Sequence, residues 1–192
     1  MIVKRAYKYR IYTNREQRNF FARTFGCVRL FYNTSLDDMN KLYKEKKEYK
    51  DITPASYKER FPFFKEVDSL ALSNAQLNRN KALKSFFKKQ NKFPKFKAKR
   101  NRQSYSTNNQ NGTVYLSEDC KYISLPKIKN IKIKMHRKFD GVIKTVTVSK
   151  ECDETYYVSI LVEENIEAKP KSKNSVGIDL GIKSYIVDSN AK

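Results

Sequence analysis

Hydrophobic periodicity changes twice along this chain, and this change limits the folds that the chain can adopt. Residues 2–12 alternate between an apolar phase and a phase that contains Lys8 and Arg10, which predicts a strand with one wet, basic face. Apolar residues then recur at helical spacing, and from about Thr113 short alternating segments return. The chain is therefore expected to be a β domain into which a helical region is inserted.

The first helical stretch is expected to begin near Thr13-Asn14 and to end at about Lys47. These two residues offer an N-cap, and Glu16 stands three residues after Thr13, as in a capping box. Gly26 either divides the stretch into two helices or lets neighbouring helices pack closely. The expected core positions are Phe20, Phe21, Thr24, Phe25, Val28, Leu30, Phe31 and Leu36.

A second long helix is expected from Leu70 to about Lys89, with Ser69 as its cap. Pro54 and Pro62 bracket a short helix or loop before it. About three helices thus separate the first strand from everything that follows. The candidate core positions of the second long helix are Leu72, Leu77, Leu83 and Phe87.

The last part of the chain is expected to form short strands joined by turns. With the N-terminal strand, about five of them predict an α+β protein built on a small antiparallel β-barrel or sandwich. Residues 166–174 are polar, contain Pro170 and are expected to be a linker. The expected strands are 113–117, 121–125, 131–136, 142–150 and 155–164, and two more lie in 175–192 around a tight turn at Gly181.

Charge is the feature that most limits the function. The 192 residues contain 41 Lys and Arg against 20 Asp and Glu, a formal net charge of +21. A chain so far from neutrality repels itself when compact and needs a polyanion, for which nucleic acid is the first candidate. An anionic membrane and an acidic protein are the rivals, but no apolar run approaches the ~18 residues of a membrane span. No membrane and no small-molecule substrate are expected.

The N-terminal residues contain no apolar stretch of the signal-peptide kind. The expected location is therefore the cytoplasm, or the bacterial nucleoid. The cysteines Cys27, Cys120 and Cys152 are scattered and form no CxxC pair, and His136 is the single histidine. This spacing argues against a disulfide framework and against a zinc site within the chain, so the cysteines are expected to be structural.

The basic stretch Lys81–Arg102 is the strongest candidate for a nucleic-acid contact. Its 22 residues contain ten Lys or Arg and no acid, with phenylalanines between them. Cations pair with phosphates and aromatic faces stack on bases. The alternative is a solvated helix end whose phenylalanines belong to the core. This alternative is favoured for Phe86 and Phe87, whereas nucleic-acid contact is favoured for residues 93–97, because Pro94 keeps them out of a regular helix. The candidates are Lys88, Lys89, Lys92, Phe93, Lys95, Phe96, Lys97, Lys99, Arg100 and Arg102.

Two further segments are candidates for the same role. In residues 103–111, short polar side chains stand beside the basic run, where they would read base edges or hold phosphates, or form a plain surface loop. The candidates there are Ser104, Tyr105, Thr107 and Asn108. Residues 127–138 contain six Lys or Arg on an alternating strand, with Lys132 and Lys134 as candidates to lie along a nucleic-acid backbone. A solvated face explains that pattern equally well. Lys8 and Arg10, on the wet face of the first strand, are candidates for nucleic-acid contact as well.

Asp179 lies within the string Gly-Ile-Asp-Leu-Gly at residues 177–181. An Asp between buried apolar positions of a strand is costly unless it is paired or bound to metal. Nucleases of the RNase H type place an Asp in their first strand in this manner and bridge it to other carboxylates with two Mg²⁺ ions. Sugar-kinase and chaperone ATPases open with similar strings, but here Ile182-Lys183 replaces the expected hydroxyls. An ordinary strand and turn is the remaining alternative.

Seven segments occur in an order that resembles the OrfB/TnpB proteins of insertion sequences, RNA-guided nucleases that are often described as transposases. The resemblance extends from about Lys4 to Val187. The segments are AYKYRIYTNREQ, FGCVRLFYN, a Ser-capped helix ending in FF, FPKFKAKRNRQSYST, ISLPKIKNIKIKMHR, KTVTVSKECDETYYVSILVE and VGIDLGIKSYIV.

The resemblance implies an architecture and a set of partners. Residues 1–12 and 100–165 would form the wedge domain, which grips a guide RNA, and residues 13–99 a helical, helix-turn-helix-like recognition lobe. Residues 166–174 would be the linker, and residues 175–192 the start of a RuvC nuclease domain with Asp179 as its first acid and Mg²⁺ as cofactor. The partners would be a guide RNA and double-stranded target DNA. By motif position, the candidates for reading the DNA are Ser73, Asn74, Thr107 and Asn108.

The family's second and third acids and its zinc ribbon have no counterpart in these 192 residues. One carboxylate cannot hold two metal ions in a competent site, so this polypeptide by itself is expected not to cut DNA. It would be the N-terminal part of a nuclease, and a cleavage-inactive DNA-binding regulator or a nonfunctional transposase remnant is the alternative. A ribosomal-type basic RNA-binding protein is a third possibility and would give Asp179 no role.

Overall fold

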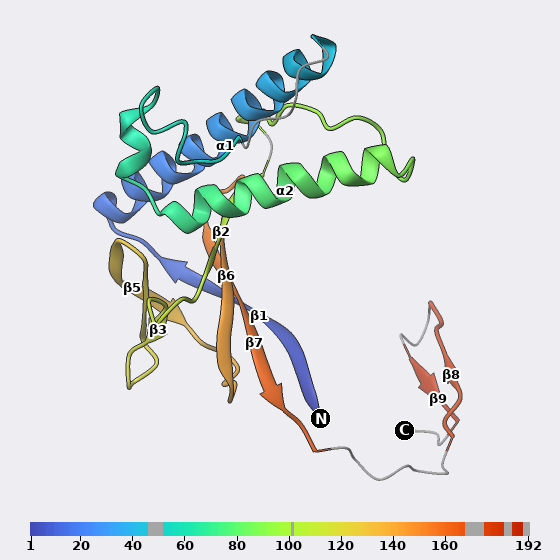
Figure 1. Ribbon diagram of the computed structural model, residues 1–192. Coiled ribbons are helices and arrows are strands. Elements are labelled where there is room, and N and C mark those ends of the chain that lie inside the picture. Colours follow the sequence, from blue (N-terminus) through green and yellow to red (C-terminus); the bar gives the residue numbers. More distant parts are fainter. Residues whose placement is uncertain (46–51, 101, 168–174, 183–185, 190–192) are drawn as a thin grey trace.

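The computed structural model describes residues 1–45, 52–100, 102–167, 175–182 and 186–189. Helices occupy the first half of the chain after one initial strand, and strands occupy the second half (Figure 1). The elements are β1 (Ile2–Tyr12), α1 (Arg15–Lys44), η1 (Pro62–Lys65), α2 (Ser69–Phe87), β2 (Gln103–Asn108), β3 (Tyr115–Leu116), β4 (Tyr122–Leu125), β5 (Ile128–Lys134), β6 (Val142–Lys150), β7 (Tyr156–Asn165), β8 (Ile178–Asp179) and β9 (Val187–Asp188).

In the described part of the chain, seven strands form one antiparallel sheet in the order β2-β6-β7-β1-β5-β4-β3. The first strand, β1, lies at its centre and pairs with β7 along almost its whole length, and with β5 near its end. The helical region between β1 and β2 is therefore an insertion into the sheet, as the sequence predicts. The sheet curls into a half-barrel with β2 and β3 as separate edges, so the expected antiparallel barrel is present in part, in an open form.

Strand β2 is the element that the sequence pattern does not predict. Residues 103–108 are polar and were candidates for a loop, yet they pair with β6 from Gln103 opposite Lys150 to Asn108 opposite Thr145. The strand alternates, with Tyr105 and Thr107 facing the core. A polar sequence can form an edge strand because its backbone bonds are supplied by β6 and its outward side chains meet water.

The two α-helices of the described region differ from the sequence prediction at their ends and at Gly26. Helix α1 continues through Gly26 without a break, since the burial of neighbouring apolar residues outweighs the ~1 kcal/mol that a helical glycine costs. Its capping box joins Asn14 to Gln17, one residue later than predicted. Helix α2 is capped by Asp68 instead of Ser69, because the Asp68 carboxylate accepts a hydrogen bond from the Leu70 amide at 2.9 Å.

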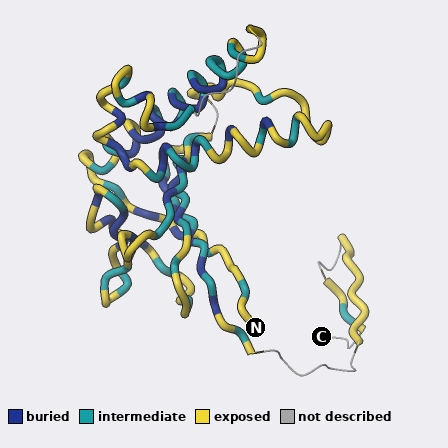
Figure 2. The backbone as a smooth tube through the Cα atoms, in the orientation of Figure 1, coloured by how far each residue is buried: buried dark blue, intermediate teal, exposed yellow. Residues whose placement is uncertain are grey.

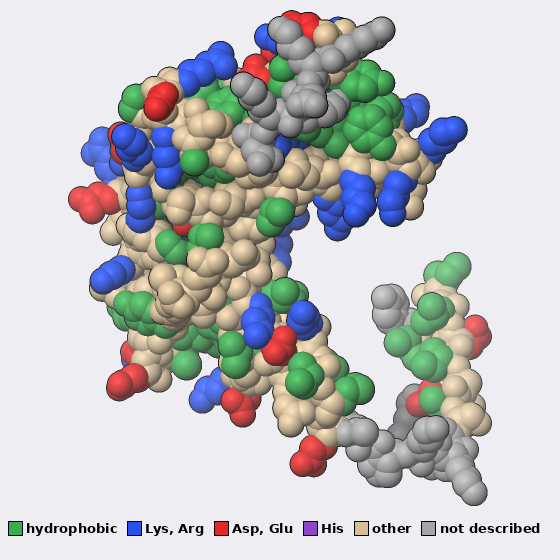
Figure 3. Space-filling model, viewed as in Figure 1, with side chains coloured by type: hydrophobic (Ala, Val, Ile, Leu, Met, Phe, Trp, Pro, Cys, Tyr) green, Lys and Arg blue, Asp and Glu red, His purple; other side chains and the backbone are tan. Residues whose placement is uncertain are grey.

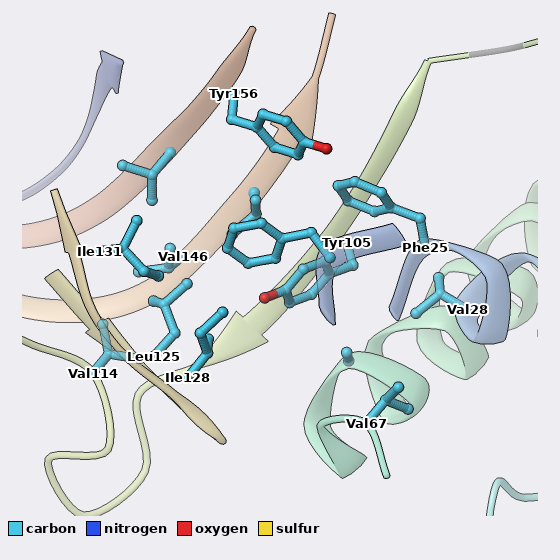
Figure 4. Packing of buried hydrophobic residues seen from close by; sticks show 14 of the residues in the cluster. Phe25, Val28, Val67, Tyr105, Val114, Leu125, Ile128, Ile131, Val146 and Tyr156 are labelled. Atoms are coloured by element: carbon cyan, nitrogen blue, oxygen red, sulfur yellow. The ribbon is translucent and has the colours of Figure 1, made fainter. Parts of the chain in front are cut away.

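Aromatic rings join the helical layer to the sheet. The ring of Phe21 lies 5.7 Å from that of Tyr156 and 6.2 Å from that of Tyr105, and Phe25 lies 5.8 Å from Tyr105. Figure 4 shows side chains from the helices and from several strands converging on this region. Buried residues concentrate where the helices meet the sheet, as Figure 2 shows. This junction is the main core of the described residues.

Two residues predicted for the core of α2 are exposed instead. Leu77 has an exposed fraction of 59% and Phe87 of 57%. Leu77 lies about 200° around the helix from the buried Arg79, so it faces away from the core. Phe87 is the last residue of α2. The other two predicted positions, Leu72 and Leu83, are buried as expected.

Strands β8 and β9 form a short hairpin, with Ile178 opposite Asp188. Figure 1 draws it apart from the large sheet. Ile178 and Leu180 are 63% and 72% exposed, so the expected apolar burial on both sides of Asp179 is wrong in this structure. Two strands of two residues each cannot bury their own side chains. Most of the predicted linker, residues 168–174, lies outside the described residues, and β7 extends through Asn165.

Replacing Phe21 by Ala should lower the free energy of unfolding by about 3–5 kcal/mol, because a fully buried ring between α1 and the sheet is lost. Urea denaturation followed by circular dichroism measures the change. Phe96→Ala is the matched control, since Phe96 is 59% exposed, and should change the stability by no more than about 0.5 kcal/mol. Equal effects of the two substitutions would contradict the core described above.

Candidate nucleic-acid interface

Four predicted cations come together on one face of the sheet. Arg10 of β1 lies directly opposite Lys134 of β5. Two residues further along β1, Tyr12 lies opposite Lys132. Lys8 precedes Arg10 by two residues and therefore lies on the same side of the strand. All four cations are exposed, whereas the residues between them, such as Tyr9 and Ile133, are buried. We call the face that carries Lys8, Arg10, Lys132 and Lys134 the outer face.

Aromatic rings lie among these cations, although composition and charge do not single them out. The ammonium of Lys8 lies 4.4 Å from the ring centre of Tyr157, and the guanidinium of Arg10 lies 5.2 Å from that of Tyr12. Strand alternation was the available signal, because it places Tyr157 on the side opposite to the buried Tyr156. Tyr12 is exposed and Tyr157 is half-buried, and cations beside rings that reach the surface offer both phosphate pairing and base stacking.

The segment Lys88–Arg102, which we call the basic segment, leaves α2 and returns across α1 without regular secondary structure in its described residues. The Asn33 side chain on α1 holds it there: the Lys97 amide donates to Asn33 Oδ1 at 2.8 Å, and Asn33 Nδ2 donates to the Lys97 carbonyl at 2.9 Å. The Lys97 ammonium lies 4.3 Å from the ring centre of Tyr32. Partial loss of water lowers the pKa of Lys97.

The basic segment presents its predicted residues to solvent. Phe93 packs edge-on against Phe86 with 5.2 Å between ring centres and is still 40% exposed, while Phe96 is 59% exposed. Figure 3 shows Lys and Arg side chains on the helical layer and others on the sheet. The other predicted residues of the segment are also exposed, namely Lys88, Lys89, Lys92, Lys95, Lys97, Lys99, Arg100 and Arg102.

Glu151 connects the basic segment to the outer face. Its carboxylate lies 3.3 Å from the Lys8 ammonium and 3.2 Å from an Arg102 guanidinium nitrogen. Arg102 also donates to Ser149 at 3.3 Å. The two basic regions, predicted separately from distant parts of the sequence, are therefore one continuous surface. Exposed ion pairs of this kind are weak and exchange readily for contacts with a phosphate.

The polar candidates occupy different environments. The segments that contain Ser73-Asn74 and Thr107-Asn108 do lie side by side, because Asn74 Nδ2 donates to the Leu70 carbonyl at 3.0 Å and to the Ser106 carbonyl at 3.1 Å. The side chain of Asn74 thus links α2 to β2. Tyr105 and Thr107 are 3% and 0% exposed, so their side chains do not reach the surface. Ser104 is exposed, and Ser73 and Asn108 are half-buried.

The described residues contain no group of three or more His, Cys, Asp and Glu side chains that could hold a metal ion. Asp179 is exposed on β8. The arrangement therefore does not fit a two-metal site by itself. The three cysteines are free, and burial raises the pKa of the Cys27 thiol to about 11, which keeps it unreactive. Cys152 is exposed in the turn after β6, contrary to its expected structural role.

No helix within the described ranges is long and apolar enough to cross a membrane.

The family model for the helix-turn-helix domain of OrfB proteins of the IS605 group matches residues 1–48. The chain is 29% identical over 99% of its length to a Streptomyces pristinaespiralis protein named provisionally as an RNA-guided DNA endonuclease, of which the match covers 49%. It is 27% identical over 92% of its length to the similarly named InsQ of Escherichia coli K12, of which the match covers 45%. The OrfB/TnpB resemblance is confirmed. The chain spans about half the length of the curated relatives that it matches.

The OrfB helix-turn-helix match falls on a different local structure. Residues 2–12 form β1 and residues 15–44 form one uninterrupted helix, with no turn between two helices in the described part of the matched region. The matched residues instead contain the strand at the centre of the sheet and the helix that packs on it. The matched segment therefore carries Lys8 and Arg10 of the outer face on β1, and it supports the basic segment through Asn33 on α1.

Replacing Asn33 by Ala should release the basic segment, because both hydrogen bonds to Lys97 are lost. At about 0.5–1.5 kcal/mol per bond, local opening should become roughly tenfold more frequent. Hydrogen exchange of the Lys97 amide measures the opening. Asn78→Ala, on the exposed side of α2, is the control and should leave that amide unchanged. Unaltered protection in Asn33→Ala would show that Asn33 does not hold the segment.

Proposed function

We propose that this chain is the nucleic-acid-binding portion of a transposon-associated RNA-guided DNA endonuclease, with a guide RNA and double-stranded target DNA as its partners. The observation that carries the proposal is the continuity of the basic segment and the outer face through Glu151. A surface that is basic, aromatic and continuous suits a long polyanion better than a small ligand. The names of the matched relatives support the same assignment.

Within this proposal, the sheet β1–β7 takes the place of the wedge domain and contacts the guide RNA. Its outer face combines Arg10 and Lys134 with the rings of Tyr12 and Tyr157. RNA loops and ends present unpaired bases that stack on aromatic side chains, whereas the phosphates pair with cations. Both kinds of group are present on this face, so it can bind RNA through backbone and bases together.

The helical region, with the basic segment, takes the place of the recognition lobe and contacts target DNA. Ser73 and Asn108 remain candidates for reading base edges, since both are partly exposed. The Thr107 side chain is buried in the core and the Asn74 amide is engaged between α2 and β2, so we assign these two a structural role. Lysines of the basic segment would position the duplex through its phosphates.

Asp179 is proposed as one acid of a RuvC-type nuclease site that binds Mg²⁺. Such a site would need further carboxylates, because the described residues bring no group of three or more His, Cys, Asp and Glu side chains together. In a two-metal site several carboxylates fix the two ions. We therefore expect the 192-residue polypeptide to bind nucleic acid without cutting it.

Lys95→Ala and Lys99→Ala should each weaken binding to every nucleic-acid sequence and should lower the slope of log affinity against log salt concentration by about one unit. Fluorescence anisotropy across a salt series measures this slope. Lys65→Ala, outside both basic regions, is the control and should leave the slope unchanged. Unchanged slopes for both lysine variants would contradict a phosphate-binding role for the basic segment.

Glu151→Gln should tighten binding, because it releases Lys8 and Arg102 from a competing carboxylate.

A further inference from the structure

An open apolar groove lies between the C-terminal halves of α1 and α2. Its volume is about 550 Å³, within the range of roughly 300–1,000 Å³ that is usual for ligand pockets. Leu36 and Leu83 form its buried floor, as part of a small core that is separate from the main one. The function proposed above makes no use of this groove.

Aromatic rings form the walls of the groove. Phe87 lies 6.5 Å from Tyr43 and 5.4 Å from Phe86 between ring centres, and Phe86 meets Phe93 edge-on. Tyr43 is 61% exposed and Phe87 is 57% exposed. Large rings exposed to this extent around a hollow are unusual for a surface without a ligand. Flat aromatic faces are the surfaces on which nucleobases stack.

In the described part of the chain, the charged side chains that line the groove are of one sign. Among the described residues that line it, the charged side chains are those of Lys84 and Lys88. Both belong to the stretch Lys81–Arg102, which contains ten Lys or Arg and no acid. Figure 3 shows hydrophobic side chains gathered at this end of the helical layer with Lys and Arg side chains beside them. A ligand for the groove should therefore combine flat apolar rings with negative charge.

We propose that the groove binds unpaired nucleotides of a single-stranded nucleic acid, with bases stacked against Phe87 and Tyr43 and phosphates beside Lys84 and Lys88. The proposal rests on the nucleic-acid-binding function above and adds a site for bases, apart from the outer face. A second copy of this chain is a poor occupant, because two chains of net charge +21 repel each other. An acidic amphipathic peptide matches the charge, but the walls are dominated by rings, which favour bases.

The test compares two fluorescent strands of equal length and charge, one of oligothymidylate and one of abasic sugar-phosphate. The unsubstituted chain should bind the base-bearing strand about 10-fold more tightly, the effect expected for one well-stacked base. Phe87→Ala and Phe87→Leu should both lower this ratio to the part that the rings of the outer face supply, since leucine keeps the apolar surface but not the ring. Phe87→Tyr should retain it.

Leu77→Ala is the matched control, because Leu77 lies on the same helix, has nearly the same exposed fraction and does not line the groove. It should leave the ratio unchanged. Thermal unfolding of each variant checks that the helix pair is intact. If Phe87→Ala is unstable, the comparison of the affinity ratios of Phe87→Leu and Phe87→Tyr still tests the proposal.

Equal affinity of the unsubstituted chain for both strands, with a steep salt dependence, would overturn the groove proposal and leave the nucleic-acid-binding function standing. The groove proposal would also be overturned if Phe87→Leu kept the full ratio of affinities for the base-bearing and abasic strands. The same holds if an acidic peptide bound in a way that depends on Phe87 while this ratio did not depend on Phe87. Failure to bind either strand at low salt would overturn both proposals.

Discussion

The packing of Phe21 between Tyr105 and Tyr156 is the contact on which the rest of the structure depends. It fixes α1 on the curled sheet, with ring centres 6.2 and 5.7 Å away. Tyr105 belongs to β2, which follows directly after the basic segment, and Asn33 of α1 holds the middle of that segment at Lys97. The basic segment has no regular secondary structure in its described residues, yet its position next to the outer face is defined. The reason is that the aromatic core holds in place α1 and β2, the two elements to which the segment is attached.

The sequence predicts the elements well where periodicity is strong and fails where the deciding contact is distant. The alternation at Ile2–Tyr12 and the helical spacing around Phe21 identify β1 and α1 with small errors at the ends. Strand β2 is not predicted, because a run of hydroxyl and amide side chains resembles a loop until β6 supplies its hydrogen bonds. Burial of Phe87 is predicted wrongly, because apolar spacing does not reveal that this last residue of α2 lies on the wall of an open groove.

The interface is predictable from the sequence in its charges but not in its connections. Strand alternation places Lys8 and Arg10 on one side of β1, yet nothing local indicates that Lys134 lies opposite Arg10. The role of Glu151 as the junction and that of Asn33 as the support of the basic segment depend on tertiary contacts. Conversely, both side-chain type and motif position selected Thr107, whose side chain is buried because strand alternation turns it inward.

Under the proposed function, this scaffold would let a chain with a net charge of +21 stay compact, because cations of the basic segment and of the outer face would be neutralised by a bound polyanion. The most direct test is to purify the chain from cells that carry its own locus and to sequence the RNA that accompanies it. We expect a single enriched RNA from the same genetic element. Unrelated RNA without enrichment, or no RNA, would contradict the proposal that this surface binds a guide RNA.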